Sequence, residues 1–310
     1  MLSTDPVEVP KALLAQAQSK PAVVAAVANA GSEIVMESAQ AASAKGLMTP
    51  VLVGDPDAIK RKAKDLRWDL NDVRIERVSG EQQAAECAVA LARNDEVSAI
   101  IKGDVHTDVL LRAVLNREFG LRTPSLLSHV FHMTVPGSDR PLCITDAVLN
   151  VDPTLEQKQH ILDNAVSLLH ALGNSCPRIA LLSATETPTE AMPSSLEAAQ
   201  LCERAFQKKR ADALIDGPLA FDLAVSTQAA RTKHVDGGVA GQADVILVPN
   251  IETGNALFKM MVYFRSAAAA GIVLGAKVPV MLTSRADPLA ARVASAALTS
   301  VYAASLRAAG

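Results

Sequence analysis

Short apolar runs alternate along the chain with longer alanine-rich segments of helical period, and no other feature constrains the fold as much. Strands are expected at residues 21–24, 50–53, 74–78, 99–101, 128–135, 142–145, 179–182, 213–215, 245–248, 272–274 and 278–282. Helices are expected at residues 34–44, 81–93, 107–118, 154–172, 196–206, 254–264 and 288–306. Strands that are apolar throughout are buried on both faces, as in parallel sheets that helices cover on each side. The sequence therefore predicts an α/β protein with mostly parallel sheets.

The composition excludes several classes of protein. Hydrophobic residues make up 49% of the chain and charged residues 20%, which is typical of a globular protein and not of a disordered one. Aromatic residues reach only 3% and the formal net charge is −3, so the chain has neither base-stacking platforms nor a basic surface. We therefore expect no nucleic-acid partner.

The chain is expected to be a cytoplasmic protein without a membrane partner. It contains no run of about 18 apolar residues, the length that indicates a membrane span. Its first residues, MLSTDPVE, lack the apolar core of a signal peptide. The four cysteines stand without a C-x-x-C pair, so we expect them to be reduced thiols.

Several common signatures of catalysis are absent from the sequence. They include G-x-G-x-x-G, the P-loop, H-E-x-x-H and G-x-S-x-G. His129 and His132 lie three residues apart on an expected strand, so their side chains point to opposite faces and do not share one ion. We expect no metal site and no tightly bound cofactor.

Polar residues that follow the expected strands are candidates for function, because parallel sheets bind ligands beyond the carboxyl ends of their strands. Lys102 and Gly103 end one strand, and His106 and Thr107 open the next helix. These residues suit an anion site made of helix amides, a close backbone approach and a lysine. They equally suit a plain turn in which Thr107 caps the helix.

A second polar cluster follows the strand at 142–145. Thr145 and Asp146 end the strand and Asn150 follows shortly after. Asp146 suits either the orientation of a substrate or the capping of a turn. The sequence around it leaves both interpretations open.

A third cluster follows the most continuous apolar strand. Glu252, Gly254 and Asn255 provide a carboxylate, a glycine and an amide, which suit recognition of a polar ligand. They also suit the start of a helix with Thr253 as its cap. The segment Asp-Gly-Pro at 216–218 is interpreted as a turn.

The segment before the last expected helix carries the most chemistry. Ser284, Arg285 and Asp287 offer a hydroxyl, a guanidinium and a carboxylate, and Pro288 suits the first position of a helix. Arginine binds phosphate oxygens with two parallel hydrogen bonds, serine donates to an oxyanion and aspartate accepts a proton. Asp287 also fits the role of a helix N-cap, and the two roles do not exclude each other.

With these segments considered, the chain resembles the phosphate acetyl/butyryltransferase family. It is most similar to the phosphate acyltransferase half of the bifunctional enoyl-CoA hydratase/phosphate acetyltransferase proteins. The stretches that carry the resemblance are residues 46–54, 102–122, 128–150, 179–187, 216–222, 243–255 and 271–287.

The resemblance implies a fold similar to isocitrate and isopropylmalate dehydrogenases. Two α/β domains are expected, one from residues 1–143 plus 284–310 and one from residues 144–283, with a cleft between them. The chain has 310 residues, and single cores rarely exceed about 250–300, so two domains also suit its length. The family further implies a homodimer.

The resemblance also implies a reaction and its residues. Acyl-CoA and phosphate give acyl phosphate and CoA, reversibly, without a metal and without a covalent acyl-enzyme. Ser284 and Arg285 match the pair that contacts substrate in the family. In the family a nearby aspartate is the base that takes the thiol proton, and Asp287 is the carboxylate nearest to the pair in this sequence. Acetyl-specific members have a longer stretch before their acidic residue.

Further substrate-binding residues follow from the same resemblance. They are Lys102, Gly103, His106, Thr107, Arg112, Arg122, Thr145, Asp146, Asn150, Glu252, Gly254 and Asn255. Among them, the cations Lys102, Arg112 and Arg122 would add positive charge around the phosphate.

Two other functions are compatible with the sequence. A non-catalytic module that senses acyl-CoA would share the fold, although such a module is expected to lose Ser284, Arg285 or Asp287 first, and all three are present. A dehydrogenase of similar fold would need a trio of metal-binding carboxylates and a nicotinamide.

Overall fold

This computed structural model describes every residue except 1, 139, 285 and 310, and at residue 309 only the backbone. The chain forms two compact units. The first unit comprises Met1–Asp5 and Leu126–Ala267, and the second comprises Pro6–Ser125 and Ala268–Gly310. These divisions fall at 125/126 and 267/268, whereas the sequence placed them at 143/144 and 283/284. The strand pairing accounts for the difference, because Ser128–Thr134 pairs with Leu142–Thr145 in the first unit and Val280–Met281 pairs with Ala99–Lys102 in the second.

The second unit contains a sheet with the strand order β3-β2-β1-β4-β11-β10. Its strands are β1 (Val23–Ala30), β2 (Met48–Gly54), β3 (Ile75–Arg77), β4 (Ala99–Lys102), β10 (Ala268–Leu274) and β11 (Val280–Met281). Neighbouring strands are parallel except β10 and β11. The mostly parallel sheet predicted from the apolar strands is confirmed here.

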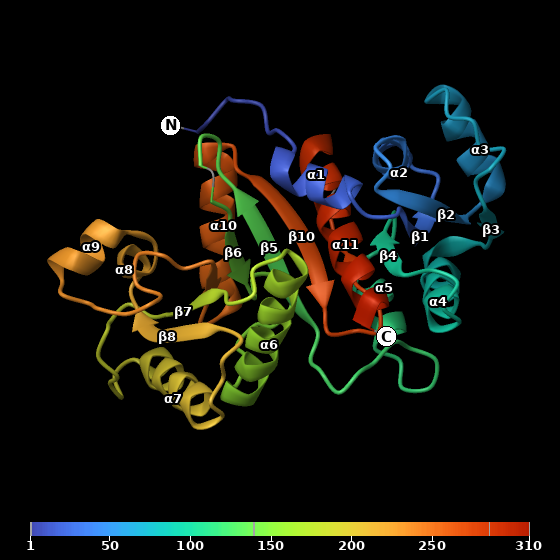
Figure 1. Ribbon diagram of the computed structural model, residues 1–310. Helices are drawn as coiled ribbons and strands as arrows, with labels where there is room; N and C mark the ends of the chain where they lie inside the picture. The colour runs from blue at the N-terminus through green and yellow to red at the C-terminus, as the bar shows by residue number, and fades with distance from the viewer. Residues whose placement is uncertain (1, 139, 285, 310) are drawn as a thin grey trace. The chain divides into compact units, whose positions relative to one another are not determined.

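Helices cover this sheet. They are α1 (Lys11–Gln18), α2 (Glu33–Ala44), α3 (Pro56–Asp65), α4 (Gly80–Arg93), α5 (Thr107–Val114) and α11 (Leu289–Ala309). The right-handed crossovers of parallel strands place α2 and α3 on one face and α4, which packs on α5, on the other. Figure 1 shows α11 running beside β10 and β4, both of which it contacts.

Helix α11 is the core helix of the second unit. Leu289–Ala308 has the length and the mean hydropathy, 1.3, of a membrane-spanning helix, and 72% of that stretch is buried inside the protein. Small side chains such as Ala294, Ala297 and Ser295 are almost fully buried along it. They allow the helix to pack closely against the strands that it covers.

The first unit contains a sheet with the order β5-β6-β9-β7-β8. Its strands are β5 (Ser128–Thr134), β6 (Leu142–Thr145), β7 (Arg178–Leu182), β8 (Leu214–Leu219) and β9 (Val245–Leu247). All neighbours are parallel except β5 and β6. The helices are α6 (Leu155–Ala171), α7 (Pro193–Gln207), α8 (Phe221–Val225), α9 (Thr227–Thr232) and α10 (Ile251–Arg265).

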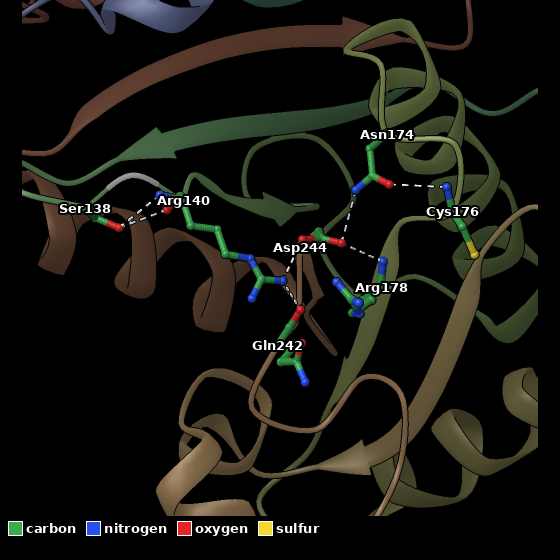
Figure 2. A network of polar contacts seen from close by, with 7 residues as sticks. All are labelled: Ser138, Arg140, Asn174, Cys176, Arg178, Gln242 and Asp244. Carbon is green, nitrogen blue, oxygen red and sulfur yellow. Dashed lines mark hydrogen bonds and ion pairs between the residues drawn. The ribbon is translucent and has the colours of Figure 1, made fainter.

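A polar network ties together the amino ends of three of these strands (Figure 2). The buried carboxylate of Asp244, just before β9, accepts hydrogen bonds from Arg140 (2.6 Å), Asn174 (3.1 Å) and the backbone N–H of Arg178 (2.8 Å). Arg140 also donates to the backbone carbonyl of Gln242. Because parallel strands leave their carboxyl ends at the opposite edge, this network stabilises the sheet away from the ligand-binding edge.

Some elements differ from those expected. Helices α1 and α3 were not predicted, and α5 ends at Val114 instead of 118. The side chain of Asn116 accepts hydrogen bonds from the backbone N–H groups of Glu118 (2.9 Å) and Phe119 (3.1 Å), which turns the chain out of the helix.

The interpretation of residues 216–218 as a turn is wrong, because they lie within β8. The pairing of β7 with β8 is irregular between Ala180 and Leu182, and a proline is tolerated in a strand at such a bulge. Any side chain at Gly217 would stand 2.7 Å from Cβ of Leu181, so only glycine allows the two strands to lie this close.

Candidate active site

Two strand ends bring distant predicted residues together in the second unit. Strands β4 and β11 are parallel neighbours, with Ile100 opposite Val280 and Ile101 opposite Met281. Their carboxyl ends therefore lie side by side. Lys102 ends the first strand, Gly103 follows it and Ser284 follows the second, so residues far apart in the sequence line one pocket.

This pocket, which we call the α2–α11 pocket, has a volume of about 30 Å³. It is lined by Ile34, Val35, Ser38, Ala39, Ala42, Met48, Ile101, Lys102, Gly103, Met281, Thr283, Ser284, Arg292 and Ala296. Polar and charged groups gather where the strands end, and apolar side chains form the rest of the wall. Such a combination is typical of small-molecule sites.

Glycine is required at position 103. A side chain there would overlap the carbonyl oxygen of Ala28 on the neighbouring strand β1. The two strand ends are also joined by hydrogen bonds, since the Asn29 amide donates to the carbonyl of Asp104 (2.6 Å) and the Asp104 N–H donates to the carbonyl of Asn29 (3.1 Å). The wall of the pocket at Lys102 is therefore held by the backbone.

The turn before α11 is held by hydrogen bonds between Ser284 and Asp287. The carboxylate of Asp287 accepts from the backbone N–H of Ser284 (2.7 Å), and the N–H of Asp287 donates to the carbonyl of Ser284 (3.1 Å). The hydroxyl oxygen of Ser284 accepts from the N–H of Ala286 (3.2 Å), and a serine hydroxyl also carries a proton that it can donate. Arg285, predicted to contact phosphate, lies outside the described residues.

The expected N-cap role of Asp287 is wrong. Helix α11 begins at Leu289, and the carbonyl of Pro288 accepts from the N–H groups of Ala291 (3.0 Å) and Arg292 (3.2 Å). Pro288 thus stands just before the helix rather than at its first position. The carboxylate of Asp287 instead closes the turn, as described above.

Burial raises the pKa of the Asp287 carboxyl above its usual range, and the hydrogen bond from Ser284 and the charge of Arg292 oppose this shift. A carboxylate with a raised pKa is a stronger base than one in water. The geometry and the electrostatics therefore suit proton transfer at this turn.

Arg292 is a site residue that the sequence analysis missed. Its side chain is only 7% exposed and lines the pocket. It donates to the carbonyl of Asp287 (2.7 Å) and to the carboxylate of Glu37 on α2 (2.9 Å), and thus joins the turn to two helices. A charged residue inside an otherwise apolar helix was the available signal, because such residues are rarely buried without a partner.

Asp287 does not line the pocket itself, and neither do four other predicted residues of the second unit, His106, Thr107, Arg112 and Arg122. Thr107 opens α5, but the helix N-cap is His106, whose backbone N–H and ring Nδ1 both lie 2.8 Å from the carboxylate of Glu81. Thr107 as the helix cap is therefore wrong. Arg112 is exposed and pairs with Asp108.

Arg122 is exposed on the segment that follows α5. Its backbone pairs in an isolated antiparallel bridge with Ala276. The extended chain on each side continues this contact, because the N–H of Lys277 donates to the carbonyl of Leu121 (2.9 Å).

In the first unit, Asp146 forms a buried hydrogen-bonding centre. Its carboxylate accepts from the N–H groups of His129 (3.0 Å), Val148 (2.8 Å) and Leu149 (2.9 Å) and from the amide of Asn150 (2.6 Å). Burial raises the pKa of this carboxyl, and the four donors oppose the shift.

The neighbours of Asp146 take part in the same structure. Asn150 also donates to the carbonyl of Leu127 (2.9 Å), and the hydroxyl of Thr145 donates to the carbonyl of His129 (2.9 Å). Because these polar atoms are satisfied by the protein, the cluster acts first as a structural support. The sequence left open whether Asp146 orients a substrate or caps a turn, and these hydrogen bonds favour its role in capping a turn.

The third predicted cluster lies at the start of α10. The helix begins at Ile251 rather than at 254, and its N-cap is Asn250, whose side chain accepts from the N–H of Thr253 (3.0 Å). Thr253 as the cap is therefore wrong. A side chain at Gly254 would stand 2.9 Å from the carbonyl of Asp146, and so the glycine lets the helix approach that loop.

The other two members of this cluster differ in exposure. The amide of Asn255 donates to the carbonyl of Ala147 (3.4 Å), whereas Glu252 is exposed in the first turn of α10. The segments at 145–150 and 252–255 are thus brought together in the first unit.

Two buried histidines and two buried or half-buried cysteines are unsuited to acid–base chemistry near neutral pH. Burial lowers the pKa of His129 to about 3 and of His132 to about 4. Burial also raises the pKa of the Cys143 and Cys202 thiols to about 12. Among the residues that the structure describes, no three histidine, cysteine or carboxylate side chains are grouped as a metal site would require.

Comparison with known proteins identifies the class of protein. The chain matches the family described as phosphate acetyl/butaryl transferase over residues 9–92 and 81–300. It is 43% identical over 297 residues to a phosphate acetyltransferase of Rhizobium meliloti, covering 96% of this chain and 94% of the relative. It is 39% identical over 291 residues to a phosphate butyryltransferase of Clostridium acetobutylicum, covering 94% of this chain and 97% of the relative.

Among solved structures, the chain is similar to a branched-chain phosphotransacylase of Enterococcus faecalis. The TM-score is 0.78 and the sequence identity 29%, covering 90% of this chain and 99% of that one. The fold is that of a phosphotransacylase, and the relatives are acyltransferases. The chain belongs to the phosphate acetyl/butaryl transferase family, as the resemblance of its sequence implied.

Proposed function

We propose that the protein transfers a short acyl group reversibly between CoA and inorganic phosphate. Acetyl-CoA or butyryl-CoA and phosphate would give the acyl phosphate and free CoA. The main support is that phosphate acetyl- and butyryltransferases match the chain almost from end to end. The pocket that joins Lys102 and Ser284 supplies groups of the chemistry that this reaction needs.

The proposed roles follow from the chemistry of each side chain. When phosphate attacks the thioester, the carbonyl oxygen becomes an oxyanion, and the hydroxyl of Ser284 is suited to stabilise it by donating a hydrogen bond. Arg285 would bind the phosphate with its guanidinium, and Lys102 would add positive charge at the same pocket. Collapse of the intermediate breaks the C–S bond and releases the CoA thiolate.

Asp287 would carry the thiol proton. It would give a proton to the departing thiolate, and in the reverse direction it would take one from CoA before the sulfur attacks the acyl phosphate. A free thiol has a pKa of about 8.5, so a base is needed near neutral pH. The raised pKa of Asp287 suits this exchange.

We also propose the setting in which the reaction takes place. CoA and acyl-CoA would act as substrates and not as tightly bound cofactors, in a cytoplasmic protein without nucleic-acid or membrane partners. A homodimer is proposed from the family and is supported by the last turns of α10, where Met260, Tyr263 and Phe264 are 57%, 55% and 46% exposed. Tyr263→Glu would then shift the mass measured by light scattering toward a monomer, and an unchanged mass would remove this support.

Release of CoA thiol tests the function directly. The protein is mixed with acetyl-, propionyl- or butyryl-CoA, with and without phosphate, and the thiol is measured with a chromogenic disulfide. Phosphate-dependent release is expected with at least one of them. Binding of acyl-CoA without release would favour the sensor module instead, and reduction of a nicotinamide would favour a dehydrogenase.

A further inference from the structure

The α2–α11 pocket extends along α2 from the strand ends into the core of the second unit. Ile34, Val35, Ser38, Ala39 and Ala42 line it from one face of the helix. The eight helical steps from Ile34 to Ala42 span about 12 Å.

The pairing of β1 with β2 and β4 shows that the pocket extends in this direction. Lys102 lies opposite Ala28 of β1, whereas Met48 lies opposite Val23, five residues earlier on that strand. Five residues of strand correspond to about 16 Å. Lys102 thus marks the open end of the pocket and Met48 its far end.

Polarity changes along this length. Ser284 and Ile34 at the open end are exposed, and Lys102, Thr283 and Arg292 add polar groups there. The far end is formed by Ala39, Ala42, Met48 and Ala296, which are 4%, 2%, 3% and 1% exposed. None of these four side chains carries a group that could bind a phosphate or the polar parts of CoA.

We propose that the α2–α11 pocket is a channel that binds the hydrocarbon chain of the acyl group. Ala39, Ala42 and Met48 would set the longest chain that the channel accepts. The proposal rests on the proposed function, because Ser284 at the open end would hold the reacting carbonyl. The carbonyl carbon then stands at the polar end and the chain extends toward Met48. A phosphate is excluded from the far end, since an anion there would have no hydrogen-bond donor.

The channel suits short chains. A water-sized sphere needs about 10–15 Å³ of such space, so 30 Å³ holds about two groups of that size. This room accommodates the two carbons beyond the carbonyl of a propionyl group. All four residues at the far end are alanine or methionine, from the three elements α2, β2 and α11, and their size determines how far the channel reaches.

The test compares two variants that change the channel in opposite directions. Ala39→Leu narrows it and Met48→Ala deepens it. The readout is kcat/KM for acetyl-, butyryl- and hexanoyl-CoA in the phosphate-dependent release of CoA. A methylene in an apolar pocket changes this ratio by about 10–200-fold, so Ala39→Leu should lower the butyryl-to-acetyl ratio at least about tenfold. Met48→Ala should raise the hexanoyl-to-butyryl ratio by a similar factor.

Ala44→Leu is the matched control, because Ala44 lies on the same helix and is exposed outside the pocket. Its ratios should equal those of the original protein. If one variant fails to fold, as shown by its circular dichroism, the other still decides the question. Ratios unchanged in the folded variants would overturn the channel while leaving the transferase function intact. An original protein that releases no CoA from any of the three substrates would overturn the function itself, and the channel with it.

Discussion

The carboxylate of Asp287 accepts a hydrogen bond of 2.7 Å from the backbone N–H of Ser284. This contact fixes the position of the Asp287 carboxylate relative to the Ser284 hydroxyl. The carboxylate would transfer the thiol proton, and the hydroxyl would stabilise the oxyanion. Arg292 holds the same turn from α11 through the carbonyl of Asp287. The turn is thus a positioned unit rather than a free loop, and its parts can be tested one by one.

Ser284→Ala removes the hydroxyl at the open end of the pocket. Loss of one oxyanion donor lowers kcat by about a hundred- to a thousandfold. We expect a decrease of this size in the release of CoA from acyl-CoA and phosphate, with little change in KM. Ser79→Ala serves as the control, because Ser79 is exposed and its side chain caps no helix. A Ser284→Ala variant within a few-fold of the original rate would show that the hydroxyl has no such role.

Asp287→Asn removes the proposed base. In the direction that uses CoA and acyl phosphate, the base acts when ionised, so kcat/KM should rise with pH through the raised pKa of Asp287. The variant should be slower by about 10²–10⁴-fold and should lose this limb of the pH profile. An identical profile in the two proteins would assign the proton to another group.

The stability of the same variant distinguishes chemistry from folding. Because burial raises the pKa of Asp287, the folded protein binds its proton more tightly than the unfolded chain. Its contribution to stability is therefore full below the pKa of the unfolded chain and is lost as the pH rises through the folded pKa. Asp287→Asn should leave the free energy of unfolding at pH 7 unchanged or higher, measured by urea titration. A large loss of stability would mean that its effect on activity is structural.

Arg292→Met removes the buried guanidinium that joins α11, the turn and α2. The carbonyl of Asp287 then loses a donor, and we expect the free energy of unfolding to fall by about 1–3 kcal/mol. Since the turn would move, kcat should fall more than KM rises. Glu37→Gln is the comparison, because Glu37 has a side chain 43% exposed and its loss leaves the contact with Asp287 in place. Equal effects of the two substitutions would contradict a specific role for the Asp287 contact.

Asp146→Asn tests the structural role assigned to the buried centre of the first unit. An amide in place of the carboxylate turns an NH₂ group toward a backbone N–H or toward Asn150, so one buried donor is left unpaired. The expected cost is about 1–3 kcal/mol in the free energy of unfolding, seen in thermal or urea unfolding. Glu252→Gln, at an exposed position, should cost little. A raised KM for acyl-CoA without loss of stability would instead support the binding role considered from the sequence.

Local sequence patterns determined much of this protein. The apolar strands predicted parallel sheets, and the glycine after Lys102 and the polar turn at 284–287 marked two strand ends as functional. Each of these signals lies within a few residues, because hydrophobic period and turn chemistry act over short distances. The irregular path of β8 was missed for the same reason, since a bulge depends on the partner strand.

The tertiary structure alone decided which of these segments meet. Lys102 and Ser284 line one pocket only because β11 inserts beside β4, and strand order is set by the packing of the whole sheet. Packing likewise brought Arg292 to the turn and surrounded Asp146 with four donors. Local patterns do not contain such contacts, because they depend on side chains from elements that are distant in the sequence.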